Sequence, residues 1–176
     1  FSLGIEGIQY KFYTLDKSTI SFGINYDDGR DKSDLPREKR SLGKIDGGID
    51  FSVSSKVLLL DNLSLGLKAS KSIEHHQRFK ASVSLGSMFP IYQKNILGRL
   101  SVSSTWSDAE LNQLYYGITN EQSINSGLPE FKANADFKDL KYSITSIFNF
   151  NQHVNASLSL SYKQLQGGAA RSPVTD

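Results

Sequence analysis

The chain has 176 residues, a formal net charge of +2 and no cysteine. This length fits one domain, the balanced charge gives no sign of nucleic-acid binding, and the missing thiols exclude disulfides and thiolate metal sites. The longest uniformly apolar run covers residues 57–60, which is far too short for a transmembrane helix.

Apolar residues alternate with small polar residues in eight segments, which predicts β-strands with two unlike faces. The predicted strands cover residues 1–13, 19–26, 45–54, 63–70, 79–86, 96–106, 140–150 and 154–162. The alternation slips near Gly7, where we expect a β-bulge. A short helix is predicted over residues 120–125, with Thr119 as N-cap and Gln122 completing a capping box.

The connections between these strands alternate between two kinds. Short turns are predicted at residues 15–18, 56–62, 89–95 and 149–153, and mostly longer polar loops at 27–44, 73–77, 107–136 and 166–176. Outer-membrane barrels have short periplasmic turns and longer outer loops. The sequence therefore predicts an all-β fold: an antiparallel, up-and-down transmembrane β-barrel formed as one domain by residues 1–176.

Both ends of the chain are interpreted as truncations, because it begins in strand-like sequence and ends in loop-like sequence. One further strand at each end gives a barrel of ten strands, and three before with one after gives twelve. About eight strands are expected within this chain.

Charged residues are expected on the face that points into the barrel. The candidate lumen charges are Glu6, Asp46, Asp50, Lys68, Lys80, Arg99, Lys141 and Lys163. These charges have two interpretations: they line a lumen that selects solutes, or they form ion pairs with one another that keep the barrel closed. Because most inward residues are Ser or Gly, we expect the lumen to hold water, a folded-in loop, or both.

Two turns are more apolar than a turn requires, and they are candidate periplasmic docking sites. Their exposed residues are Leu58, Leu59, Pro90 and Ile91. The alternative is that these residues insert into the lipid headgroup zone. The basic cluster at residues 37–40 is interpreted as a solvated loop, with contact to lipopolysaccharide phosphates as the alternative.

No catalytic, cofactor or metal site is predicted. The three histidines, His75, His76 and His153, fall in loops on opposite sides of the predicted barrel, so no third ligand converges on them. Serines are abundant, but their regular spacing marks a strand face rather than a nucleophile beside a base. We therefore expect a protein that is not an enzyme.

Three motifs carry a resemblance to a known family. They are Tyr115-Tyr116-Gly117-Ile118-Thr119, Ser126-Gly127-Leu128-Pro129, and a late stretch that includes Ser172-Pro173. In order and spacing they resemble the MipA/OmpV family of outer-membrane proteins. The sequence departs from that family at Gly168, at Arg171 and at residues 130–131.

The resemblance implies a scaffold of the cell envelope that links a lytic transglycosylase to a bifunctional penicillin-binding protein in murein synthesis. It carries over no catalytic residues. Outer-membrane lipid and lipopolysaccharide are the other expected partners, and the oligomeric state is left open. The alternatives are a small outer-membrane channel for solutes or antibiotics, a surface adhesin, and a soluble eight-stranded binder whose apolar face points inward.

Overall fold

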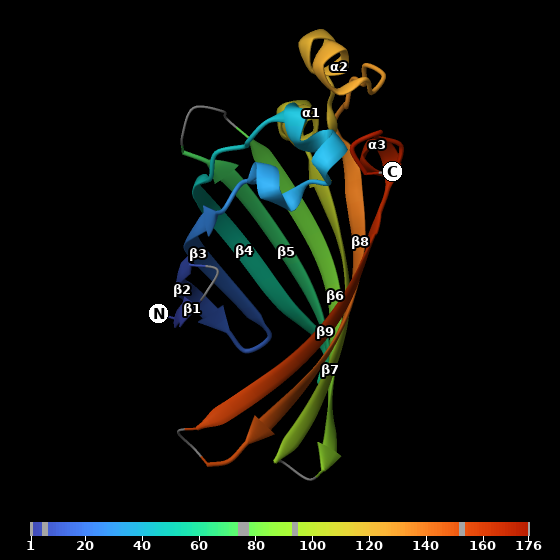
Figure 1. The fold of residues 1–176 in the computed structure, drawn as a ribbon. Helices are drawn as coiled ribbons and strands as arrows, with labels where there is room; N and C mark the ends of the chain where they lie inside the picture. Colours follow the sequence, from blue (N-terminus) through green and yellow to red (C-terminus); the bar gives the residue numbers. More distant parts are fainter. Residues whose placement is uncertain (1, 5–6, 74–77, 93–94, 152–153, 176) are drawn as a thin grey trace.

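A computed structural model describes residues 2–4, 7–73, 78–92, 95–151 and 154–175 of the chain. These residues form one antiparallel sheet of nine strands (Figure 1). The strands are β1 Ser2–Gly4, β2 Gly7–Leu15, β3 Ser18–Asp27, β4 Gly48–Leu60, β5 Leu63–Ser72, β6 Phe79–Tyr92, β7 Ile96–Ser107, β8 Asp136–Asn149 and β9 Asn155–Leu165.

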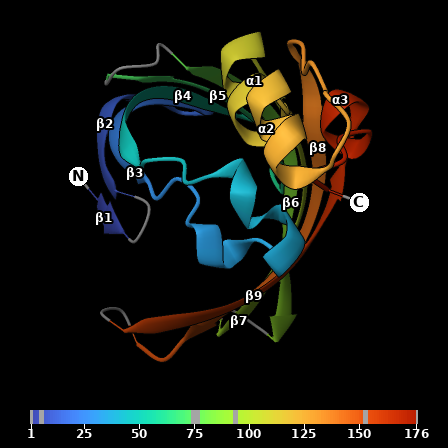
Figure 2. The same ribbon diagram turned by 45° about the horizontal axis from the view of Figure 1, so that its top comes forward.

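Each strand pairs with the next one along the chain, so the order across the sheet is β1 to β9 without a crossover. The sheet curves around an inner space in Figure 2, as the wall of a β-barrel does. The predicted all-β, antiparallel, up-and-down fold is therefore confirmed.

The two faces of the sheet follow from the alternation in the sequence. On the outer face, apolar side chains lie opposite one another from strand to strand; one such row is Val57, Leu65, Leu85, Val102, Tyr142 and Tyr162. Leu158 and Leu160 expose 71% and 73% of their surface, whereas Ser52 and Ser70 on the inner face expose 2% and 4%. Apolar residues outside and serines inside reverse the usual pattern of a water-soluble protein.

Helical segments gather at one end of the sheet, where the long loops lie (Figure 1). They are the 3₁₀-helices η1 Lys32–Asp34 and η2 Arg37–Leu42 and the α-helices α1 Ala109–Tyr116, α2 Asn120–Ser126 and α3 Gly167–Ala170. The predicted helix is confirmed as α2, with the Thr119 side chain as N-cap and Gln122 in the capping box. In the described part of the chain, no helix has the length and apolar character to cross a membrane.

The structure corrects the predicted first strand. Residues 1–13 do not form one strand, because β1 and β2 pair antiparallel with each other. The predicted bulge near Gly7 is also wrong: the alternation slips there because the chain turns back, and the register shift lies instead between Lys11 and Tyr13.

Two predicted turns are shorter than expected. β4 continues to Leu60 and β6 to Tyr92, so most of residues 56–62 and 89–95 belong to strands. Register shifts between Leu58 and Leu60 and between Pro90 and Tyr92 disturb the alternation near these ends. Pro90 lies beside such a shift, where a residue without a backbone N–H is tolerated.

Candidate functional site: the capped inner face

A connected group of polar side chains lies on the inner face near the long loops. Lys80 on β6 forms ion pairs with Asp27 at the end of β3 (3.1 Å) and with Asp50 on β4 (2.8 Å). Asp50 is buried. One ammonium group therefore joins three strands, which supports the interpretation that lumen charges pair and hold the wall together.

A tyrosine joins this ion-pair group to the loops above it. The Tyr115 hydroxyl donates to Asp27 Oδ1 (3.0 Å), and Arg30 Nη1 donates to the Tyr115 carbonyl oxygen (3.0 Å). Burial raises the pKa of the Tyr115 phenol, and the negative charge of Asp27 raises it further. Burial and Asp139 also raise the pKa of Tyr116.

These raised pKa values predict a loss of stability in alkali. The unfolded chain ionises its tyrosines above about pH 10, whereas the folded chain keeps Tyr115 neutral, so stability falls as the pH rises past that value. We expect Tyr115→Phe to lower stability by about 1 kcal/mol at neutral pH and to make the alkaline fall shallower. Thermal midpoints between pH 7 and pH 11 measure both effects.

The control for this prediction is Tyr26→Phe, at a tyrosine exposed on the outer face. It should leave both the neutral midpoint and the alkaline slope unchanged. An alkaline slope that is equally steep in wild type and Tyr115→Phe contradicts the assignment.

Three segments far apart in the sequence build a small apolar core above the sheet. Leu35, Leu42 and Ile118 are buried together, and Leu128, Phe131 and Val174 pack against them. We call residues 28–47, 108–135 and 166–175 the cap, because they lie together over one mouth of the curved sheet (Figure 2). The part containing η1 and η2 lies inside the ring of strands in that view. A folded-in loop was one of the predicted contents of the lumen.

Hydrogen bonds between the segments hold the cap together. Ser172, which is fully buried, donates to the Tyr116 carbonyl oxygen (2.6 Å). Lys39 Nζ donates to the Val174 carbonyl oxygen (3.2 Å), and Gln122 Nε2 donates to that of Leu42 (2.8 Å).

The sequence motifs that carried the family resemblance have structural positions in this cap. Tyr115 and Tyr116 end α1, and a Cβ atom at Gly117 would collide with the side chain and backbone oxygen of Gln113. Gly127 ends α2 with a φ of 72°, a left-handed conformation that favours glycine. Ser126 Oγ accepts from Leu128 N, and Pro129 follows directly. Ser172 Oγ accepts from Val174 N in the same way, with Pro173 between them. The motifs therefore specify the cap rather than a reactive site.

Most described candidate lumen charges lie on the inner face. Asp50 and Lys80 form the ion pair above, and Lys68 lines a small cavity beside Lys80. The Arg99 side chain lies near Gly86 on the inner face, and Lys141 and Lys163 lie directly opposite each other on β8 and β9. Glu6 lies outside the described residues.

Asp46 is an exception, and its prediction as a lumen charge is wrong. It precedes β4, its side chain is 87% exposed, and it pairs with Lys44 (2.9 Å). The strand starts later than predicted because Ile45 is buried and bridged to Arg30 within the cap.

Sequence reasoning missed Asp27, Lys138 and Asp139 as inner-face charges. Asp27 was assigned to a loop, although it continues the alternation of Asn25 and lies across from Gly48. Lys138 and Asp139 were excluded because β8 was predicted to begin at residue 140. Extending the period of β8 back to Asp136 would have found Asp139.

The four candidate docking residues lie in strands rather than turns. Leu58 lies near the end of β4, opposite Ser64 on the inner face of the sheet. Leu59 follows it and has an exposed side chain. Pro90 and Ile91 lie near the end of β6, where Ile91 shares a face with Phe89 and Gly98. These residues therefore do not form one patch on one face, although all four lie near the ends of β4 and β6, away from the connections that form the cap.

The cap also has an open groove of about 890 Å³ between α1, α2 and the segment that follows them. Its lining mixes apolar and charged side chains, including Leu114, Phe131, Glu110 and Lys132. Among the described residues, no three His, Asp or Glu side chains gather in a way that could hold a metal ion.

The polar inner face, the apolar outer face and the loop cap define a protein of the up-and-down β-barrel class. More particularly, the chain belongs to the family described as MltA-interacting protein MipA, whose match covers residues 1–176. The resemblance predicted from the three motifs is confirmed. Comparisons with curated proteins and with solved structures gave no match.

Proposed function

We propose that this chain forms part of an outer-membrane β-barrel that acts as an interaction protein for an MltA-type lytic transglycosylase in murein synthesis. The observation that carries the proposal is the family match over the whole chain. A bifunctional penicillin-binding protein is the proposed second partner of the same complex.

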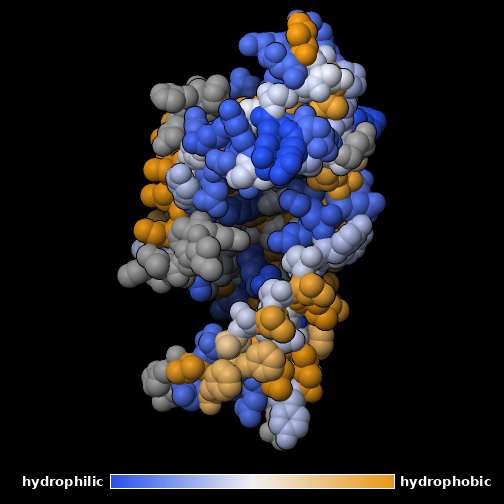
Figure 3. Space-filling view, viewed as in Figure 1, coloured by the Kyte–Doolittle hydropathy of each residue, from blue (hydrophilic) through white to orange (hydrophobic). Residues whose placement is uncertain are grey.

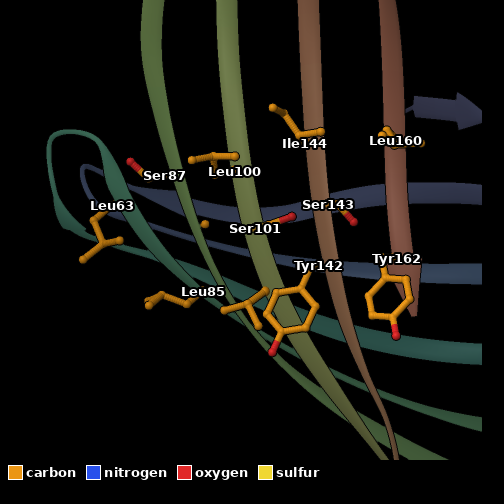
Figure 4. Close-up of a pocket in the computed structure, with 12 residues that line it drawn as sticks. Leu63, Leu85, Ser87, Leu100, Ser101, Tyr142, Ser143, Ile144, Leu160 and Tyr162 are labelled. Carbon is orange, nitrogen blue, oxygen red and sulfur yellow. The ribbon is translucent and has the colours of Figure 1, made fainter. Parts of the chain in front are cut away.

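The outer face supports a place in the membrane. A groove of about 510 Å³ crosses β5 to β9, and Figure 4 shows Leu85, Leu100, Ile144 and Leu160 along it with Tyr142 and Tyr162. In Figure 3, hydrophobic side chains gather over the part of the sheet away from the cap, and the cap itself is mostly hydrophilic. Exposed apolar area of this extent is suited to contact with acyl chains.

The uneven connections support one orientation. Long connections form the cap, and tight hairpins join the strands at the opposite end. By the usual arrangement of outer-membrane barrels, the cap faces the cell exterior and the hairpins face the periplasm, where murein is made. Of the basic cluster, Lys39 and Arg40 donate within the cap, so Arg37 is the residue we propose for contact with lipopolysaccharide phosphates.

The hairpin ends are the proposed docking surface for the transglycosylase. Leu59, Leu60, Ile91 and Tyr92 expose large apolar side chains there. We expect the combined change Leu59→Asp and Ile91→Asp to reduce capture of a purified MltA-type enzyme at least tenfold, because both substitutions put charge into an apolar contact. Capture on the detergent-solubilised barrel measures this effect.

The matched control is Ile124→Asp, at an isoleucine of the cap that is 76% exposed. It should leave capture unchanged. Equal capture by all variants contradicts docking through the hairpin ends. Release of the protein from membranes without detergent contradicts the membrane assignment separately.

A further inference from the structure

Among the described residues, basic side chains outnumber carboxylates on the inner face near the cap. In the half nearer the cap lie Lys68, Lys80, Lys138, Lys141 and Lys163, and the described carboxylates there are Asp27, Asp50 and Asp139. Asp27 and Asp50 both pair with Lys80. In the described part of the chain, Lys68, Lys138, Lys141 and Lys163 have no such ion pair.

Three of these lysines converge on one cavity. It has a volume of about 230 Å³ and is lined by Lys68, Lys80 and Lys138, by the carboxylate of Asp139, by Ala81, and by the hydroxyl residues Ser70, Ser82 and Thr105. The lining comes from β5, β6, β7 and β8, so the cations approach from several directions. Ammonium and hydroxyl groups are the donors that proteins use to hold phosphate oxygens.

The next row of the inner face adds a like-charge pair. Lys141 and Lys163 are directly opposite each other on β8 and β9. Lys138 lies within electrostatic reach of the carboxylates of Asp139 and Asp27 and of the cations Lys80 and Lys163. Like charges in directly opposed positions destabilise a sheet. Farther along the same two strands, the opposed hydroxyl residues Ser143 and Ser161 hydrogen-bond to each other, so the repulsion is confined to the lysine row.

Positive charge continues along the wall in both directions. Farther from the cap, Lys56 lies within electrostatic reach of Arg99 and Lys11. Toward the cap, the Nε of Arg78 is buried and has no hydrogen-bond partner among the described residues. Cations therefore recur along the described inner face, and three of them line the cavity at Lys68, Lys80 and Lys138.

We propose that this cavity, together with Lys163, binds a multivalent oxyanion of the phosphate class from solution. The anion provides the negative charge that the wall lacks, and it bridges lysines that otherwise repel one another. This site lies inside the barrel, so it is separate from the proposed docking surface and does not depend on the transglycosylase.

Inorganic pyrophosphate is the probe for this site. We expect calorimetry of the folded protein in nonionic detergent to show that pyrophosphate binds at one site. The affinity should fall as salt is added. The combined change Lys138→Gln and Lys163→Gln should weaken binding at least tenfold. Without pyrophosphate, Lys163→Gln alone should raise the thermal midpoint, because it removes the repulsion from Lys141.

The matched control is the combined change Lys32→Gln and Lys44→Gln, which removes the same charge from exposed positions of the cap. It should leave pyrophosphate affinity within twofold of wild type. Equal weakening in both double variants would assign the binding to diffuse surface charge and overturn the proposal, as would a wild type that does not bind. Displacement of pyrophosphate by an anionic lipid in the micelle would overturn the location inside the barrel.

Discussion

Lys80→Met should be among the most destabilising single substitutions in this chain, costing about 2–3 kcal/mol in the free energy of unfolding. The substitution removes the cation shared by Asp27 and Asp50 and leaves two carboxylates close together, one of them buried. Removing one partner of a fully buried ion pair costs more, but the Lys80 side chain is 31% exposed, and solvent screens part of the charge. Urea unfolding of the protein in lipid vesicles measures the loss.

The pH dependence of this loss identifies its cause. Protonating either carboxylate removes the repulsion, so the deficit of Lys80→Met relative to wild type should shrink as the pH falls below about 5. Lys44→Met is the control, because its ion pair with Asp46 is largely exposed and screened by solvent, so its loss should hardly change stability. A deficit that stays constant with pH would assign the effect to packing instead of charge.

Ile118→Ala should open the cap while leaving the sheet folded. Ile118 is 2% exposed and lies in the apolar core with Leu35 and Leu42. Truncating a buried isoleucine costs about 2–5 kcal/mol, and the core of the cap is small, so few other contacts remain to hold its segments together. Limited proteolysis should cut residues 28–47 and 108–135 much faster in the variant.

Ile124→Ala is a matched control for this substitution. It makes the same chemical change six positions later, at a side chain that is 76% exposed, and should cost less than about 0.5 kcal/mol. Equal proteolysis of the two variants would show that the apolar core does not hold the cap.

The strands were predictable because their signal is local. In residues 154–162 the alternation alone gives β9, its two faces and the inward direction of its serines. The helix α2 was predictable for the same reason, since Thr119 and Gln122 form its capping box within four residues. A similar signal was overlooked at α1, where the Asp108 side chain accepts from Leu111 N as an N-cap.

The cap could not be predicted, because its contacts join residues that nothing in the local sequence connects. Leu35 and Leu42 were assigned to a solvated loop, since charged residues surround them, and their burial depends on Ile118. The pairing of Lys80 with Asp27 and Asp50 could not be predicted from the local sequence either. Alternation places Lys80 and Asp50 on the inner face, but only the register of the strands brings their charges together.

The neighbour-to-neighbour strand order has a consequence for the time course of folding. Every strand pairs with the next one along the chain, so the wall can grow hairpin by hairpin, and each closure costs little chain entropy. The cap is different: its hydrogen bonds join residues 85 positions apart at Arg30 and Tyr115 and 135 apart at Lys39 and Val174. Because the entropy cost of joining such distant residues falls once the intervening strands have paired, we expect the cap to form after the strands between its segments.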